Sequence, residues 1–277
     1  MTTMEAPTGI ETIAEAFARA RANGRRAALM PYLMGGYPDL ATSRAIGLAY
    51  ADGGADLIEL GVPFSDPLAD GPVIHAAGTV ALNASPPATL PAVLEVARII
   101  AERVPVVLMC YANPIISQGL ERFLDALVAA HVSGLIVPDL PLEEATEVRP
   151  ACRRRGLAFV PLVAPTTPAE RLERIGAGAS GFVYTVSVTG TTGERGEMAQ
   201  GLATIIARTA AHTDVPVAVG FGISTPEHAA AAARAGADGV IVGTRLVRAA
   251  GEASDPAAAV RELVAGFSAA LSETSLG

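Results

Sequence analysis

The chain has 277 residues, 51% hydrophobic and 17% charged, so it is long enough to bury a large core in one or two globular domains. Its net charge of −8 disfavours nucleic acid as a partner, because binding to a phosphate backbone needs a positive face. It has no apolar run as long as a membrane span and no signal-peptide pattern in the opening MTTMEAPTG, so we expect a cytoplasmic protein without membrane insertion.

Eight short apolar segments, many of them β-branched, predict β-strands that are covered on both faces. In chain order they fall within residues 27–34, 53–62, 104–112, 131–140, 157–165, 178–187, 215–222 and 235–244. Segments with helical periodicity lie between them, and further helices are predicted at about 9–23 and about 256–273.

This alternation of strand and helix predicts the fold. It repeats eight times without a linker or a break in composition, over a length typical of a (β/α)8 barrel. We therefore predict a single TIM-barrel domain over residues 1–277, with an extra N-terminal helix covering the bottom of the barrel. The alternative is a doubly wound sheet, but GFGIST at 220–225 has only the first two glycines of a dinucleotide-binding fingerprint.

Few residue types are available for catalysis. All twenty basic residues are arginine, so the chain cannot form a lysine imine with a carbonyl substrate or with pyridoxal phosphate. No pair among the four histidines has metal-ligand spacing, and we predict that no metal is bound. Cys110 and Cys152 lie in apolar segments and are expected to be reduced packing residues.

The segment ELGVPFSDPLADGP, residues 59–72, contains three acidic residues and no basic one. Glu59 lies on the predicted strand within 53–62, where successive side chains point to opposite faces. If Ile58 and Leu60 pack on the helices, Glu59 points into the barrel. A carboxyl group buried without a cation has a raised pKa and can exchange protons near neutral pH, as an acid/base catalyst must. The alternative is a structural glutamate whose oxygens are satisfied by hydroxyl groups or water.

Two aspartates follow in the same proline-restricted loop. If the loop folds back over its strand, Asp70 presents an anion to the ligand that Glu59 serves. The alternative role for Asp70 is to cap the helix that begins near GPVIHAAGTV. Asp66, in FSDP, is more typical of a turn former or a surface contact than of a catalyst.

Three glycine-containing loops follow the last three predicted strands: TGTTG at 189–193, GFGIST at 220–225 and VGT at 242–244. Loops after the seventh and eighth strands, together with the amides of a helix N-terminus, form the usual phosphate site of such barrels and need no lysine. The three loops together predict a site for a phosphate ester.

The motifs LIELGVPFSDPLADGPVI, LMCYANPI, VPDLPLEE, VYTVSVTGTTG, GFGIST and GVIVGTRLV, in that order, resemble the tryptophan synthase alpha subunit family along nearly the whole chain. The resemblance implies a carbon–carbon lyase of tryptophan biosynthesis that cleaves indole-3-glycerol phosphate to indole and glyceraldehyde 3-phosphate. It implies a heterotetramer of two alpha and two beta subunits, with no cofactor on alpha and pyridoxal phosphate only on beta.

The resemblance also implies residue roles. Glu59 matches the acid/base glutamate, Asp70 the indole-binding aspartate and Tyr184 an active-site tyrosine. The residues that match phosphate-binding positions are Thr192, Gly193, Gly222, Gly243 and Thr244. Thr244 stands where the family has serine, and Tyr32 stands where it has phenylalanine.

Asp66 and Asp139 follow the second and fourth predicted strands, and they are expected to contact the beta subunit at the barrel mouth. Three alternatives to a lyase that works with a beta subunit stay open: a stand-alone lyase that releases indole, another carboxylate-dependent sugar-phosphate barrel such as an isomerase, and a non-catalytic regulator of beta. The presence of both Glu59 and Asp70 disfavours the regulator.

Overall fold

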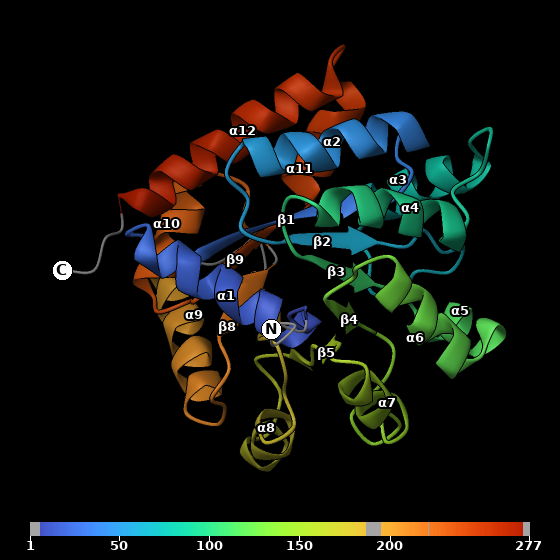
Figure 1. Cartoon of the computed structure of the whole chain (residues 1–277). Coiled ribbons are helices and arrows are strands. Elements are labelled where there is room, and N and C mark those ends of the chain that lie inside the picture. The colour runs from blue at the N-terminus through green and yellow to red at the C-terminus, as the bar shows by residue number, and fades with distance from the viewer. Residues whose placement is uncertain (1–5, 187–194, 221, 274–277) are drawn as a thin grey trace, which may run out of the picture.

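The computed structural model describes residues 6–186, 195–220 and 222–273. Short strands form the centre of the molecule and helices lie around them (Figure 1). The strands are β1 Ala28–Met34, β2 Ile58–Gly61, β3 Val106–Met109, β4 Gly134–Ile136, β5 Ala158–Phe159, β6 Leu162–Val163, β7 Val183–Val186, β8 Val217–Gly220 and β9 Gly239–Val242. Each strand falls within one of the eight predicted segments.

The strands close into a barrel. Their order is β5-β4-β3-β2-β1-β9-β8-β7-β6, and every pairing is parallel. The two end strands, β5 and β6, are halves of one predicted segment that is interrupted at Val160 and Pro161, and Pro161 has no amide hydrogen to donate. Backbone bonds from Val160 N–H to Leu135 O (2.9 Å) and from Tyr184 N–H to Pro161 O (2.9 Å) join this segment to both neighbours. The (β/α)8 prediction is confirmed, and the doubly wound alternative is wrong.

The helices that the structure describes are α1 Gly9–Ala22, α2 Leu40–Asp52, α3 Pro72–Asn83, α4 Leu90–Ala101, α5 Ala112–Gln118, α6 Leu120–Ala129, α7 Val148–Arg154, α8 Ala169–Gly176, α9 Arg195–Ala210, α10 Pro226–Arg234, α11 Thr244–Glu252 and α12 Pro256–Ser272. The predicted terminal helices correspond to α1 and α12. The simple alternation was incomplete, because two helices rather than one follow β2 and β3. Gly119, with a φ of 81°, separates α5 from α6 in a conformation that favours glycine.

The extra N-terminal helix covers one end of the barrel, as predicted. Its first turn is fixed by a capping box between Thr8 and Glu11. Ile13 and Phe17 belong to the cluster of side chains that fills the barrel interior, and the ring of Phe17 lies 5.9 Å from that of Phe182. These contacts place α1 against the end of the barrel where the strands begin.

Strand alternation divides the core into an inner and an outer layer. Leu57 lies in the inner cluster with Val107, whereas Ile58 and Leu60 lie in the outer cluster under the helices. Glu59, between Ile58 and Leu60, therefore faces the inside of the barrel, as the sequence predicted.

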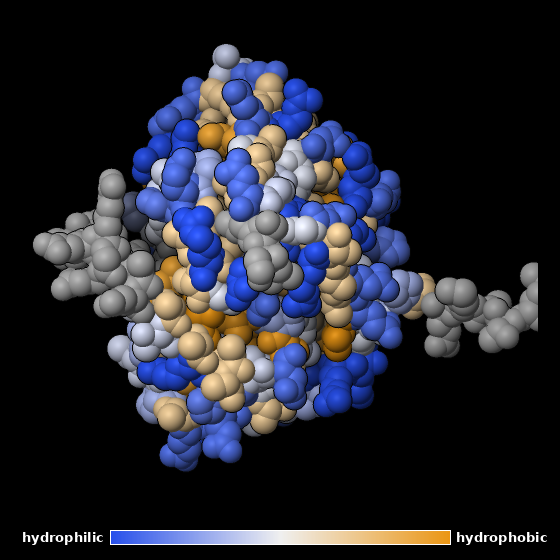
Figure 2. All heavy atoms as spheres, turned by 90° about the vertical axis from the view of Figure 1, so that its left-hand side faces the viewer, coloured by the Kyte–Doolittle hydropathy of each residue, from blue (hydrophilic) through white to orange (hydrophobic). Residues whose placement is uncertain are grey.

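The outer surface is that of a helical shell. On the face that carries α9 and α10, Figure 2 shows mainly hydrophilic side chains above and below, with hydrophobic side chains gathered in a band across the middle. None of the helices described above is long and apolar enough to cross a membrane. That residues 1–277 form a single domain stays a prediction.

Candidate active site

Glu59 lies near the carboxyl end of β2, beside Tyr32 of β1 and Val107 of β3 in the sheet register. Its side chain is only 2% exposed, and its Oε2 has no hydrogen-bond partner in the part of the chain that the structure describes. Among the described residues, no basic side chain forms an ion pair with it.

This environment changes the protonation of Glu59. Burial, and to a smaller extent the charge of Asp70, raises the pKa of Glu59 from 4.5 to about 8. The carboxyl group is therefore largely protonated at neutral pH and close to the pH at which it exchanges its proton. This is the property that acid/base catalysis requires of a carboxyl group in the neutral range.

Asp70 lies in the loop between β2 and α3 and is partly buried. The helix N-cap is Gly71, with Pro72 at the first helical position and no side-chain cap bond, so the interpretation of Asp70 as a cap is wrong. The residue before it, Ala69, donates a hydrogen bond from its N–H to the Tyr111 hydroxyl at 3.1 Å. Burial raises the pKa of Asp70, and the nearby Tyr111 hydroxyl and the charge of His75 act in the opposite direction.

Two further tyrosines line the barrel interior near Glu59. Tyr184 of β7 is 7% exposed and Tyr32 of β1 is 5% exposed. A β-carbon on Gly220 would overlap the Tyr184 hydroxyl, and one on Gly61 would overlap the Tyr32 hydroxyl, so the glycines make room for both. Burial raises the pKa of each tyrosine and the nearby Glu59 adds to the effect, so both hydroxyls remain neutral hydrogen-bond donors.

The described part of the predicted phosphate site lies at the ends of β8 and β9. Gly222 follows β8 with a φ of 77°, a conformation suited to glycine. Gly243 is the N-cap of α11 and Thr244 is its first residue. The first amides of a helix have no carbonyl partner within it and point outward, which favours an anion. Thr192 and Gly193 lie outside the described residues.

The two predicted interface aspartates lie in loops on the same side of the barrel. Asp66 is exposed in the β2–α3 loop, whereas Asp139, after β4, accepts a hydrogen bond on Oδ1 from Ala112 N–H (2.9 Å). Leu68 and Ile116, in neighbouring segments, are 82% and 77% exposed. The sequence does not mark these two apolar side chains as exposed, because exposure is not visible in their local pattern.

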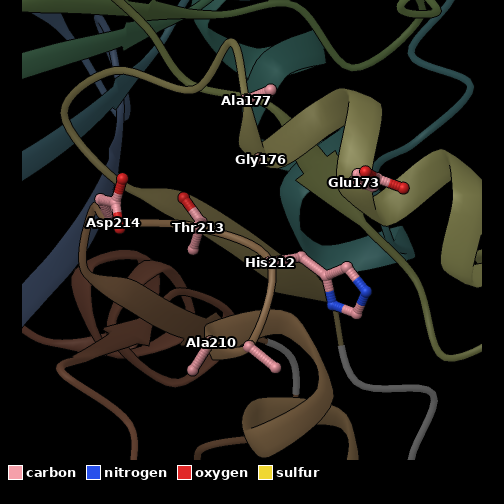
Figure 3. Close-up of a pocket in the computed structure, with 8 residues that line it drawn as sticks. Glu173, Gly176, Ala177, Ala210, His212, Thr213 and Asp214 are labelled. Carbon is pink, nitrogen blue, oxygen red and sulfur yellow. The ribbon is translucent and has the colours of Figure 1, made fainter.

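One surface hollow lies away from these residues. It has a volume of about 520 Å³ between the end of α8 and the turn that precedes β8, and Figure 3 shows Glu173, His212 and Asp214 around it. Barrel enzymes bind substrates at the opposite end, where the strands finish. A smaller hollow of about 260 Å³ lies beyond β4 and β5, with Asp139 and Arg171 in its lining.

Comparisons with known proteins agree with this geometry. A family model described as tryptophan synthase alpha chain matches residues 17–273. Tryptophan synthase alpha chains from Prochlorococcus marinus (strain MIT 9313) and Roseiflexus castenholzii are 48% and 50% identical, over 86% and 85% of this chain and 86% and 90% of theirs.

Solved structures give the same result. Mycobacterium tuberculosis tryptophan synthase matches with a TM-score of 0.86 at 37% identity, over 99% of this chain and 100% of that chain. Tryptophan synthase subunit alpha from Legionella pneumophila str. Paris matches with a TM-score of 0.86 at 34% identity, over 97% of this chain and 100% of that one. Because the family model matches most of the chain, and because the relatives share its barrel and align over most of their length, the chain belongs to the tryptophan synthase alpha chain family.

Proposed function

We propose that the chain cleaves indole-3-glycerol phosphate to indole and glyceraldehyde 3-phosphate, as a lyase of tryptophan biosynthesis. The observation that carries the proposal is the position of Glu59, which is buried inside the barrel, forms no ion pair with a described residue and has a pKa raised to about 8. Family membership supports the same reaction. Glu59, Asp70 and Tyr184 are the proposed catalytic residues.

The reaction reverses an aldol addition and needs an acceptor for the electrons of the broken carbon–carbon bond. The chain contains no lysine that could supply an imine, so the substrate itself must provide the acceptor. Proton transfer from Glu59 to indole C3 makes a cationic ring, and the bond to the glycerol chain then breaks with its electron pair passing into the ring. A base removes the glycerol hydroxyl proton as the aldehyde forms, and the carboxylate left on Glu59 is suited to accept it.

The cationic intermediate explains why, in the described residues, no arginine forms an ion pair with Glu59 or Asp70. Asp70, in its anionic form, stabilises the positive charge that develops near the indole N–H. An arginine paired to either acid would oppose that charge and would also lower the pKa of Glu59. The neutral hydroxyls of Tyr32 and Tyr184 add polarity without adding a competing charge.

For the phosphate group we propose a site made of Thr192, Gly193, Gly222, Gly243 and Thr244. A β-carbon on Gly243 would lie 3.6 Å from Tyr32 Cβ, an ordinary contact, so the fold tolerates a side chain there. Gly243→Asp should therefore weaken substrate binding by roughly tenfold or more through charge repulsion at the helix N-terminus, whereas Gly243→Ala should fold equally well and bind better than the aspartate variant.

For the partner we propose a beta subunit that carries pyridoxal phosphate and receives the indole, in a heterotetramer of two subunits of each kind. The docking face contains Asp66 and Asp139, together with the exposed apolar side chains of Leu68 and Ile116. Large exposed apolar groups beside charged ones are typical of an interface. A cytoplasmic location and the absence of a cofactor on this chain complete the proposal.

The decisive experiment measures indole released from indole-3-glycerol phosphate, with and without a beta subunit. We expect slow release by the chain alone and faster release with beta, because docking orders the loops around the site. Full activity without beta identifies a stand-alone lyase, and no release under either condition overturns the proposed function. Binding of open-chain sugar phosphates but not of indole-propanol phosphate would instead favour an isomerase.

A further inference from the structure

Tyr32 of β1 lies beside Glu59 of β2 and points the same way. The two residues are Cα partners in the parallel register of these strands, and Tyr32 is 5% exposed. Each stands two positions after a residue of the inner cluster, Met30 on β1 and Leu57 on β2. Side chains two positions apart on a strand share a face, so the Tyr32 ring faces the barrel interior together with the Glu59 carboxyl group.

The Tyr32 side chain crosses from the proposed phosphate site to the strand of Glu59. At one end, a β-carbon on Gly243, the N-cap of α11, would lie 3.6 Å from Tyr32 Cβ. At the other end, a β-carbon on Gly61 would overlap the Tyr32 hydroxyl, so the hydroxyl lies over Gly61 of β2. Gly61 is on the same face as Glu59 and about 6.6 Å further along the strand, at roughly 3.3 Å per residue. The hydroxyl is therefore on the mouth side of Glu59, from which a substrate enters.

The Tyr32 hydroxyl has no strong acceptor within the described residues. Its contact there is with the thioether sulfur of Met34, at 4.0 Å, and a thioether is a weak acceptor. Met34 packs with Ile74 and Ala77 of α3, which keep the sulfur in place. A buried donor without a good acceptor costs about 1–3 kcal/mol. Burial also raises the pKa of Tyr32, so the hydroxyl keeps its proton at neutral pH and can donate it to a ligand.

Under the proposed function, the two ends of the Tyr32 side chain correspond to the two ends of the glycerol chain of the substrate. The phosphate binds at the N-terminus of α11, and indole C3 lies at Glu59 to receive its proton. The glycerol chain spans these two points, as Tyr32 does. Its first carbon, which is bonded to indole C3, therefore lies at the hydroxyl end of Tyr32. That carbon carries the hydroxyl group that becomes the aldehyde.

We propose that the Tyr32 hydroxyl donates a hydrogen bond to the oxygen on this first carbon, and that it thereby positions the glycerol chain between the phosphate site and Glu59. The inference rests on the proposed function, because it concerns the same substrate. It assigns Tyr32 to the chain rather than to the indole ring or the phosphate. A ligand with the ring and the phosphate but no chain hydroxyl groups therefore tests it.

The test compares two ligands in the Glu59→Gln background, which leaves indole-3-glycerol phosphate uncleaved. Indole-propanol phosphate has the same ring and phosphate but lacks both hydroxyl groups of the chain. Tyr32→Phe keeps the ring over Gly61 and removes only the donor, so the dissociation constant of indole-3-glycerol phosphate should rise roughly twofold to tenfold. That of indole-propanol phosphate should not rise. Isothermal titration calorimetry measures both constants.

Tyr50→Phe is the matched control. Tyr50 is also fully buried, but it belongs to the outer cluster, and its hydroxyl donates to the backbone carbonyl of Tyr32 at 3.1 Å. Its loss can only displace Tyr32 as a whole, so the dissociation constants of the two ligands should change by the same factor. Urea unfolding should show a smaller loss of stability for Tyr32→Phe than for Tyr50→Phe, because a thioether is a weaker acceptor than a carbonyl.

The outcomes separate the inference from the proposed function. Equal changes for both ligands in Tyr32→Phe, or no change for either, overturn the role of the Tyr32 hydroxyl and leave the proposed function standing. Weaker binding of indole-propanol phosphate alone also overturns that role. A Glu59→Gln chain that binds neither ligand, together with a wild type that releases no indole, overturns the proposed function and the inference at once.

Discussion

Two acidic residues, three positions apart, are buried in the barrel, and they differ in whether their carboxyl groups are paired. Asp56 and Glu59 are 5% and 2% exposed. At the end where β2 begins, Asp56 forms an ion pair with Arg25 and accepts a hydrogen bond on Oδ2 from Leu29 N–H at 2.8 Å. At the other end, Glu59 Oε2 has no hydrogen-bond partner within residues 6–186, 195–220 and 222–273. Burying a charge costs several kcal/mol unless it is paired. The pairing of Asp56 with Arg25 therefore stabilises the fold, whereas the unpaired carboxyl group of Glu59 is suited to proton transfer.

Arg25 extends the first arrangement into a small network. Its guanidinium also donates to Gly54 O (3.2 Å) and Ser268 Oγ (3.3 Å), which connects the start of β2 to helix α12. Burial raises the pKa of Asp56 while Arg25 and the Leu29 amide lower it, whereas for Glu59 burial and Asp70 both raise the pKa. The presence or absence of one arginine thus distinguishes a structural acid from a candidate catalytic one.

Glu59→Gln should give the largest effect that the comparison predicts. The amide keeps the shape of the side chain but cannot exchange the proton, so cleavage should fall by about a hundredfold to ten-thousandfold. Indole release from indole-3-glycerol phosphate measures the loss. Far-UV circular dichroism and urea unfolding should show an intact fold, and turnover at the wild-type rate would remove Glu59 from the mechanism.

Asp56→Ala should do the reverse, with a large effect on stability and little on the reaction. It leaves Arg25 buried without its carboxylate, and breaking a buried pair in this way costs about 3–5 kcal/mol. Urea denaturation measures the change, and kcat per folded molecule should stay near that of the wild type. The control is the double variant Arg25→Met with Asp56→Leu, which removes both charges and should recover most of the stability.

The comparison also shows what could be predicted from the sequence. The inward position of Glu59 followed from the apolar residues on either side of it, because alternation in a buried strand is a local property. The hydrogen bond from Ala69 N–H to the Tyr111 hydroxyl could not be predicted in the same way: the two residues are 42 positions apart, and their contact depends on how a long loop folds. The cap interpretation of Asp70 was wrong because Gly71 and Pro72 begin the helix without a side-chain acceptor. The pair of helices after β2 was missed, although Pro86 and Pro87 interrupt the segment between them.

The pH dependence of stability sharpens the contrast at Glu59. Its pKa is about 8 in the folded chain against 4.5 for the free side chain, so the folded state holds the proton more tightly. The contribution of Glu59 protonation to the free energy of unfolding is fully present below pH 4.5. It is lost as the pH rises toward 8, at about 1.4 kcal/mol for each pH unit. The difference in free energy of unfolding between wild type and Glu59→Gln, measured at several pH values, should follow this slope. A difference that does not change with pH would mean that Glu59 is ionised in the folded chain.

Asp66→Ala should give the smallest effect, because it changes the mouth of the barrel without touching either buried acid. Asp66 is exposed and lies in the loop that also holds Leu68 and Asp70, so its removal should leave basal cleavage within about twofold of the wild type, as for most surface changes. Activation by beta should fall severalfold, because a charged group at the rim of an interface contributes to docking. Indole release titrated against beta separates the two effects, and Glu252→Ala, in helix α11, is a control for the loss of one exposed acid. If both variants are activated like the wild type, beta docks elsewhere, and Glu59 and Asp70 act without help from this part of the loop.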